Sequence, residues 1–348
     1  MRKTLDLSFS KKENWVKKYN ELDFSVLCDK LAEKKSTLIL FHVRPDGDSV
    51  GSALALKLLL EASGSRAWCV CTNEIPQRLR FLSEGVQESA IVEAIPEDFV
   101  AERVITVDTA STSQLGTLYE IFGGRIDFMI DHHAKGEPYA DHYVAPEASA
   151  AGEIVFDISR EFLKRGIVDS IPKKVDFCIY AAISSDTGCF KYPNVTAKTH
   201  ICSAELLNSE IDTAEINRLL FDSKSMEVLA AEKAGFDTIK MFHNGKIAVV
   251  FFTYDMKVTL GVLDEHLETL IDVARSVEGV EVAVAIRQPN AEKSFRVSTR
   301  SANSVDVSAV CAYFGGGGHI RAAGCTIVAD SIWHVADLIV GEIEKQMY

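Results

Sequence analysis

Short runs of apolar residues alternate with segments of helical periodicity through the first half of the chain. Between Asn14 and Lys34, apolar side chains recur at roughly helical spacing and predict an amphipathic helix. The apolar runs that indicate strands lie at 37–41, 67–71, 103–107 and 126–130, with a further run at 177–183. Strand-like runs separated by helical segments are typical of a parallel α/β sheet.

The second half of the chain has a similar alternation. Segments rich in β-forming residues lie at 246–254, 280–287 and 294–299, a helix is expected at 264–276, and the stretch 197–220 between the halves looks helical. We therefore predict an α/β protein with a cleft between two domains. Its parts are a larger N-terminal domain with a mainly parallel sheet flanked by helices (1–195), a helical linker (196–230) and a smaller C-terminal α/β domain (231–348).

Acidic residues and histidines follow the apolar runs of the first half. The carboxyl ends of parallel strands form the crevice in which open α/β sheets bind ligands, so these side chains are expected to meet there. Imidazole nitrogens and carboxylate oxygens suit manganese or another borderline divalent ion. The residues that concentrate this chemistry at the strand ends are His42, Asp46, Asp48, Asp108, Asp131, His132, His133 and Asp186. Of the adjacent His132 and His133, one can bind metal while its neighbour faces substrate.

Each of these motifs also has a purely structural explanation. Pro45-Asp46-Gly47 can form a turn, and Asp48 or Ser49 can cap the helix that follows. A single histidine at the end of an apolar strand is more often a core residue than a ligand. However, four separate strand ends all present carboxylate or imidazole. Independent turns do not require this combination, so it favours a metal centre.

Composition and charge exclude several classes of function. The formal net charge of -13 argues against extended, sequence-independent binding of polynucleotide, because such binding depends on many Lys and Arg contacts to phosphate. The eight cysteines include no CxxC pair, so neither a zinc knuckle nor a disulfide framework is indicated. The charged first residues and the absence of a long apolar stretch predict a soluble, cytoplasmic protein without a membrane partner. Fingerprints of dinucleotide cofactor and nucleoside triphosphate binding are missing.

The second half carries a candidate anion site. The run Gly315–Gly318 leads into His319, where backbone N–H groups and the start of a short helix could face an anion. Arg300 ends a predicted strand and offers a planar bidentate donor for phosphate. The plain alternatives are that the glycine run is a flexible connector and that Arg300 is a solvated cation at the end of a strand.

Taken together, these motifs resemble the DHH phosphoesterases with a C-terminal DHHA1 domain, particularly the bifunctional oligoribonuclease (nano-RNase) and pAp phosphatase branch. The resemblance extends over the first half through His42–Ser52, Val107-Asp108, Asp131-His132-His133 and Ser185–Gly188. In the second half it covers Ser298–Ser301, Gly315–His319 and Ala322-Ala323-Gly324. It implies that residues 1–195 are the DHH catalytic domain and 231–348 the substrate-binding DHHA1 domain.

The resemblance also implies the roles of individual residues. His42, Asp46 and Asp108 would hold one divalent ion, and Asp48, Asp108, His132 and Asp186 the other, so that Asp108 bridges the two. Catalytic roles are implied for Asp108, His132, His133 and Asp131, with Asp131 orienting the imidazoles. The implied substrate-binding residues are His133, Arg300, Ser301, Gly317, Gly318 and His319.

The implied activity is hydrolysis of RNA of two to a few nucleotides and of pAp to AMP, by a hydroxide that bridges two metal ions, with pApA as a further candidate substrate. Manganese is the expected metal, with magnesium or cobalt as alternatives. Long duplex nucleic acid is not an expected partner, and a homodimer is a candidate assembly. Three alternatives stay open: a family II inorganic pyrophosphatase, a cyclic or linear dinucleotide phosphodiesterase, and a nucleotide-binding regulator without turnover.

Overall fold

The computed structural model describes residues 19–347, which form two compact units divided between residues 222 and 223. The predicted linker, 196–230, spans this division, and the three-part division stays a prediction. The first part of the predicted helix from Asn14 lies outside the described residues. Its remainder contains α1 (Phe24–Ala32).

The first unit is built on a five-stranded sheet in the order β2-β1-β3-β4-β5. All of its neighbouring strands are parallel, as predicted. The four predicted strands are confirmed; they are β1 (Thr37–Leu40), β2 (Ala67–Val70), β3 (Arg103–Val107) and β4 (Phe128–Asp131). The edge strand β5 (Asp141–Val144) was not predicted, because its half-buried side chains give no apolar run.

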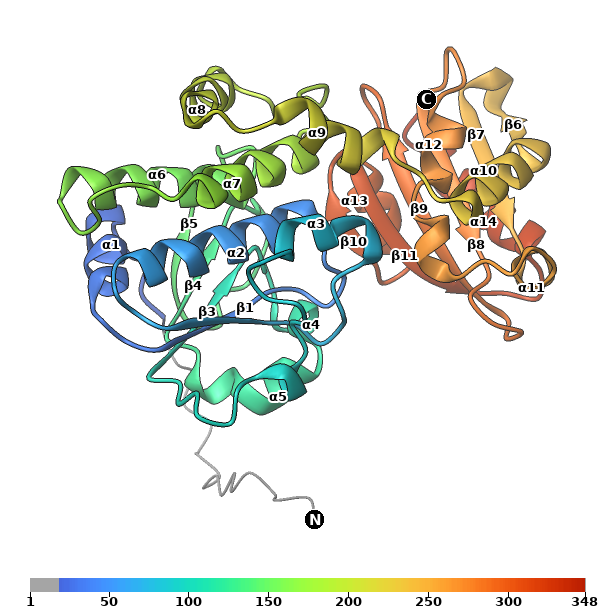
Figure 1. Ribbon diagram of the computed structural model, residues 1–348. Helices are drawn as coiled ribbons and strands as arrows, with labels where there is room; N and C mark the ends of the chain where they lie inside the picture. The colour runs from blue at the N-terminus through green and yellow to red at the C-terminus, as the bar shows by residue number, and fades with distance from the viewer. Residues whose placement is uncertain (1–18, 348) are drawn as a thin grey trace. The chain divides into compact units, whose positions relative to one another are not determined.

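Helices cover both faces of this sheet (Figure 1). One face packs on α1, α2 (Gly47–Ala62), α6 (Ala151–Lys164) and α7 (Lys173–Asp186). The other face packs on α4 (Thr112–Leu115) and α5 (Thr117–Phe122). Because successive strand residues point to opposite faces, a sheet covered on both sides needs continuous apolar strands. The sequence of β1, Thr-Leu-Ile-Leu, is fully buried in this way.

The apolar run 177–183 is helical, so the prediction that Asp186 follows a strand is wrong. The run lies within α7, and Asp186 is the last residue of that helix. A buried helix exposes no polar face, and over a short apolar run its sequence cannot be distinguished from that of a buried strand. Asp186 therefore reaches the strand ends from a helix that packs over the sheet.

Small residues allow α2, α6 and α7 to approach one another closely. A Cβ atom added to Gly51 of α2 would lie 2.6 Å from the Cys178 carbonyl oxygen and 3.0 Å from the Ala182 Cβ, both in α7. A Cβ on Gly152 of α6 would lie 2.7 Å from the same Ala182 Cβ. Asp48 lies one turn before Gly51, and Asp186 lies one turn after Ala182. This close packing fixes the spacing between the helices that carry these two acids.

The remaining helices of the first unit are short and follow the loops between larger elements. The predicted helix at 197–220 is broken into α8, α9 and a π-helical turn. The bounds are α3 (Arg80–Ser83), α8 (Ala197–Leu206), α9 (Thr213–Asn217) and the π-helical turn Arg218–Asp222. Short 3-10 turns lie at 77–79, 92–94, 123–125 and 207–209.

The second unit contains a six-stranded mixed sheet in the order β10-β11-β9-β8-β7-β6. Only the β7–β8 pair is parallel among its strand pairs. The strands are β6 (Lys240–Phe242), β7 (Ile247–Phe252), β8 (Val282–Arg287), β9 (Ser294–Ser301), β10 (Gly317–His319) and β11 (Ala322–Val328). The three β-rich segments that the sequence indicated are therefore strands, and the predicted fold class is confirmed.

Helices lie on both faces of the second sheet. One apolar cluster joins the sheet to α10 and α12, and the other joins it to α13 and α14. The bounds are α10 (Met226–Thr238), α11 (Tyr254–Leu260), α12 (Leu270–Arg275), α13 (Val307–Tyr313) and α14 (Ile332–Glu344), with 3-10 turns at 243–245 and 264–267. Among residues 19–347, no helix has the length and apolar character needed to cross a bilayer.

Candidate metal centre

The candidate ligands meet where the strand order of the first sheet reverses direction. The chain runs from β1 to β2 on one side and returns to β3 on the other, so the switch point lies between β1 and β3. His42 follows β1 and Asp108 follows β3, which places both at the carboxyl ends beside this switch point. Open α/β sheets bind their ligands in that crevice.

Asp108 is the centre of the cluster. Its Oδ2 lies 3.5 Å from Nε2 of His42, and its Oδ1 lies 3.5 Å from Nε2 of His132. The residue is 2% exposed, and Oδ1 is a buried acceptor without a hydrogen-bond partner in the described structure. Its φ of 54° is uncommon for a residue with a side chain and is found where local structure is constrained. The two carboxylate oxygens thus face two different imidazoles.

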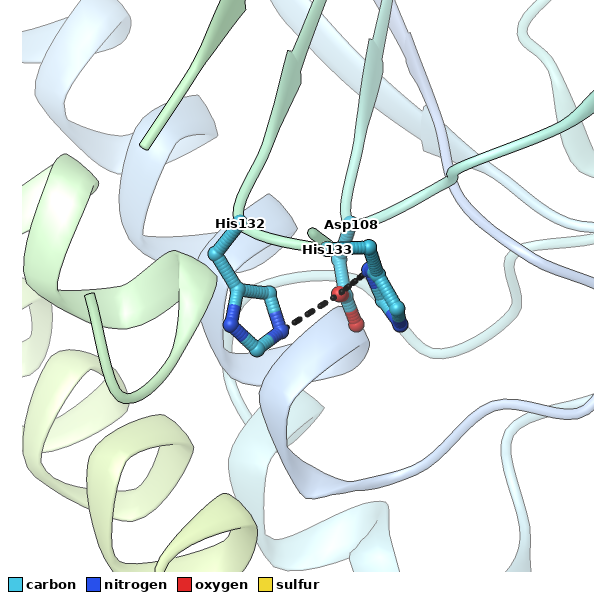
Figure 2. Close-up of side chains that lie close together, drawn as sticks. All are labelled: Asp108, His132 and His133. Atoms are coloured by element: carbon cyan, nitrogen blue, oxygen red, sulfur yellow. Dashed lines mark ion pairs between the residues drawn. The ribbon is translucent and has the colours of Figure 1, made fainter. Parts of the chain in front are cut away.

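Figure 2 shows Asp108 between the side chains of His132 and His133, which leave the chain directly after β4. Nδ1 of His133 lies 3.7 Å from the Asp108 Oδ1. The two imidazole rings are 4.7 Å apart between centroids. Adjacent histidines after one strand therefore both reach the same carboxylate.

His42 and Asp46 form one side of the cluster with Asp108. Oδ2 of Asp46 lies 3.5 Å from the His42 Nε2. Oδ1 of Asp46 accepts a hydrogen bond of 2.9 Å from the Ser49 amide and caps α2. The capping explanation and the ligand explanation are therefore compatible, because one carboxylate oxygen serves each. The cap belongs to Asp46, whereas the sequence pointed to Asp48 or Ser49.

Asp48 and Asp186 form the opposite side with His132. Nε2 of His132 lies 3.6 Å from Oδ2 of Asp48 and 3.8 Å from Oδ2 of Asp186. The Asp48 carboxylate is held rigidly, because it accepts hydrogen bonds from three donors. These are the amides of Ala151 (2.7 Å) and Gly152 (3.0 Å) at the start of α6 and the Ser52 hydroxyl (2.9 Å).

Backbone and carboxylate partners orient the two histidines. Nδ1 of His132 lies 3.2 Å from the Ala148 carbonyl oxygen, which can only accept, so Nδ1 carries a proton and Nε2 faces the acids. Nδ1 of His133 lies 2.8 Å from Oδ1 of Asp131. Asp131 therefore orients one imidazole, that of His133, whereas a backbone carbonyl orients His132.

The crowding of charges in this cluster shifts several pKa values. Burial raises the pKa of Asp186 to about 7, against the opposing effect of His132. Burial and then the charge of Asp108 hold the pKa of Asp48 well above its usual range. For His132, burial alone would lower the pKa, but Asp108 and Asp48 raise it well above the ordinary value. Asp48 and Asp186 are thus the carboxylates whose charge the neighbouring residues compensate least.

These residues fit a divalent metal ion. Three groups can each bring their donor atoms within 4.8 Å of one another: His42-Asp46-Asp108, Asp48-His132-Asp186 and Asp108-His132-His133. All the donors are imidazole nitrogens or carboxylate oxygens, which suit manganese and similar ions. The orphaned Oδ1 of Asp108 and the mutual repulsion of the buried acids are the features that a bound cation would stabilise.

The predicted substrate residues of the second unit lie on neighbouring strands. His319 of β10 pairs with Ala322 of β11, which pairs with Arg300 of β9, so the side chains of His319 and Arg300 belong to the same face of the sheet. The expected short helix after the glycine run is wrong, because Gly317–His319 forms an edge strand. A Cβ on Gly318 would lie 2.7 Å from the Ala323 Cα, so the glycines allow β10 to pair closely with β11.

Ser301 follows Arg300 at the end of β9. Its hydroxyl donates a hydrogen bond of 2.7 Å to the Val305 carbonyl oxygen. The same hydroxyl lies 3.4 Å from Nη1 of Arg321. The structure thus gives the Ser301 hydroxyl contacts within the protein, and its contact with substrate stays a prediction.

Sequence reasoning missed the groups that hold the candidate ligands in place. They are the carbonyl of Ala148, just before α6, and the amides of Ala151 and Gly152, the first two residues of α6. Backbone groups have no side-chain signature. The only available signal was the run of small residues Ala148-Ser149-Ala150-Ala151-Gly152 before a helical segment, which permits close approach of a backbone.

Known proteins resemble this chain in both sequence and structure. Residues 36–183 match the DHH family, N-terminal domain, and residues 244–345 match the DHHA1 domain. The bifunctional oligoribonuclease and PAP phosphatase NrnA of Thermus thermophilus is 30% identical over 296 residues, covering 83% of each chain. The protein of the same description from Bacillus subtilis is 27% identical over 310 residues, covering 88% of this chain and 94% of its own.

Among solved structures, an exopolyphosphatase-related protein from Bacteroides fragilis superposes with a TM-score of 0.81 at 22% identity, covering 92% of this chain and 95% of its own. This likeness shows a shared fold. The parallel sheet with acids and histidines at its switch point, followed by a mixed-sheet unit, defines a two-unit α/β protein with a candidate metal centre. The chain belongs to the DHH family and carries a DHHA1 domain, which confirms the resemblance inferred from its motifs.

Proposed function

We propose that this chain is a metal-dependent phosphoesterase that hydrolyses very short oligoribonucleotides to mononucleotides and pAp to AMP. The names of the two relatives from Thermus thermophilus and Bacillus subtilis describe oligoribonuclease and PAP phosphatase activities. The observation that carries the proposal is the position of Asp108, whose two oxygens lie 3.5 Å from two different imidazoles. A carboxylate in that position is suited to contact two ions at once.

Two ligand groups are proposed around Asp108. His42, Asp46 and Asp108 form the first group, and Asp48, Asp108, His132 and Asp186 form the second. When bound, a pair of divalent ions lowers the pKa of a water molecule and stabilises negative charge on phosphoryl oxygens. Manganese is the proposed ion, with magnesium or cobalt as alternatives, because the donors combine imidazole with carboxylate.

The protein's own residues prepare this site for phosphoryl chemistry. The amides at the start of α6 hold Asp48, and the Ala148 carbonyl holds the His132 ring with Nε2 toward the acids. Asp131 fixes the ring of His133, and although burial alone would lower the pKa of His133, Asp131 raises it. A protonated His133 is a hydrogen-bond donor suited to an oxygen of the substrate phosphate.

The second unit is proposed to bind the substrate through Arg300, Ser301, Gly317, Gly318 and His319. The guanidinium of Arg300 matches the bidentate geometry of phosphate. Arg300 pairs with Ala322, which pairs with His319, so the cationic side chain of Arg300 and the imidazole of His319 lie on one face of the sheet. The edge strand β10 is exposed over its whole length, so its backbone is accessible to a small anionic ligand.

A substrate panel with purified protein tests the proposed function. We expect the protein with Mn²⁺ to release AMP from both pApA and pAp, to act more slowly on long RNA, and to lose activity when the metal is chelated. Cyclic di-AMP and pyrophosphate complete the panel. Hydrolysis of pyrophosphate without release of AMP from pAp would favour the pyrophosphatase alternative, and nucleotide binding without any turnover would favour a regulator.

A further inference from the structure

The segment that follows Asp186 bends sharply away from α7. Gly188, Cys189 and Phe190 all have positive φ, of 55°, 58° and 61°. Residues other than glycine normally adopt this left-handed conformation singly, because of steric conflict between Cβ and the following carbonyl. Three in succession therefore require surrounding contacts that hold the turn.

Contacts of Thr187 and Phe190 hold the turn in place. The Thr187 hydroxyl donates to the Ile183 carbonyl oxygen (2.6 Å) and accepts from the Phe190 amide (3.1 Å). The Phe190 ring packs 5.9 Å from Tyr180 and stacks 5.7 Å from His200, between ring centroids. The chain consequently doubles back, and Asn194 returns to the end of α7.

The side-chain amide of Asn194 connects two parts of the candidate metal centre. Its Nδ2 donates to the Asp186 carbonyl oxygen (3.1 Å) and to the Ser149 carbonyl oxygen (2.9 Å). Both partners are acceptors, so the NH₂ group of the amide must face them. Ser149 lies between Ala148, which holds His132, and Ala151, which holds Asp48.

We propose that Asn194 is a positioning residue for the second metal ion, because its amide ties the backbone of Asp186 to the loop that holds His132 and Asp48. The three ligands of the Asp48-His132-Asp186 group come from α2, the end of β4 and the end of α7. The loop 148–152 fixes two of them, and Asn194 joins the third to that loop. In the described structure, none of the hydrogen bonds and ion pairs of His42 and Asp46 involves Asn194. This inference rests on the proposed two-metal function.

The test is the number and affinity of Mn²⁺ ions bound to metal-free protein, measured by titration calorimetry with elemental analysis. The variants are Asn194→Ala and Asn194→Leu, neither of which can donate a hydrogen bond. Asn208→Ala, at an exposed asparagine of the same unit, is the matched control. The thermal unfolding of each metal-free variant is measured alongside.

We expect the wild type and Asn208→Ala to bind two ions. Both Asn194 variants should bind the first ion normally and the second roughly 10- to 100-fold more weakly, as when outer partners of metal ligands are removed. Normal affinity for both ions in the Asn194 variants would overturn the role of Asn194 but not the proposed two-metal function. Equal weakening of both ions with a lowered unfolding temperature would overturn it in favour of general destabilisation. Fewer than two ions in the wild type would overturn the two-metal function as well.

Discussion

Replacing Gly51 with alanine tests how helix packing positions the proposed metal ligands. The added Cβ would lie 2.6 Å from the Cys178 carbonyl oxygen and 3.0 Å from the Ala182 Cβ. The carbonyl belongs to the backbone of α7, so only a shift between α2 and α7 can relieve the contact. Overpacking of this kind costs about 1–3 kcal/mol, whereas alanine in place of glycine gains about 0.8–1.0 kcal/mol within a helix.

The steric cost should exceed the gain in helix propensity. At the middle of both ranges the net loss is about 1 kcal/mol, which corresponds to a fall of about 2–4 °C in the unfolding temperature for a domain of this size. Because α2 carries Asp48 and α7 ends at Asp186, separation of the helices should also weaken the second Mn²⁺ ion.

Calorimetric unfolding of the metal-free protein and Mn²⁺ titration measure the two effects of Gly51→Ala. Gly124→Ala is the control, since a Cβ at Gly124 meets no atom within 4 Å. An unfolding temperature at or above that of the wild type, together with unchanged Mn²⁺ affinity, would refute the packing argument.

Further substitutions separate the roles of the remaining groups. Asp108→Asn should lose both tightly bound ions and all measurable hydrolysis, and elemental analysis that still finds two ions would contradict a bridging role. His133→Ala should keep both ions while kcat falls roughly 10²- to 10³-fold, the range for loss of one hydrogen-bond donor to charge that develops in the transition state; an unchanged kcat would remove His133 from the mechanism. Arg300→Ala should lower kcat/KM for pAp about 10- to 100-fold, from the loss of a charged hydrogen bond of about 1.5–3 kcal/mol, with Mn²⁺ stoichiometry unchanged. Removal of metal with EDTA should lower the unfolding temperature. An ion present at a free concentration of 100 times its Kd stabilises the folded state by about 2.7 kcal/mol. An equal unfolding temperature with and without EDTA would argue against tight metal binding.

The parts of the site that follow buried strands could be predicted from the sequence. Each apolar run of the first sheet ends where a polar residue begins, and parallel strands bring those ends to one edge. This pattern predicts that His42, Asp108 and His132 lie near one another, and the structure gives them contacts of 3.5 Å through Asp108. Their roles as ligands stay proposals.

Other features carry no local signal in the sequence. Asp186 reaches the cluster from α7, and the apolar run before it has the same appearance as a buried strand. The glycine run before His319 forms an edge strand because β11 provides a pairing partner from later in the chain. The supports from Ala148 and Asn194 depend on backbone carbonyls brought together by tertiary structure, and periodicity cannot reveal them.

Anomalous diffraction from crystals of the Mn²⁺-loaded protein would locate the bound ions. We expect two manganese peaks in the first unit, one beside His42 and Asp46 and the other beside Asp48, His132 and Asp186, each in contact with a different oxygen of Asp108. A single peak at saturating Mn²⁺, or two peaks of which only one touches Asp108, would contradict the proposed bridging of two ions by Asp108.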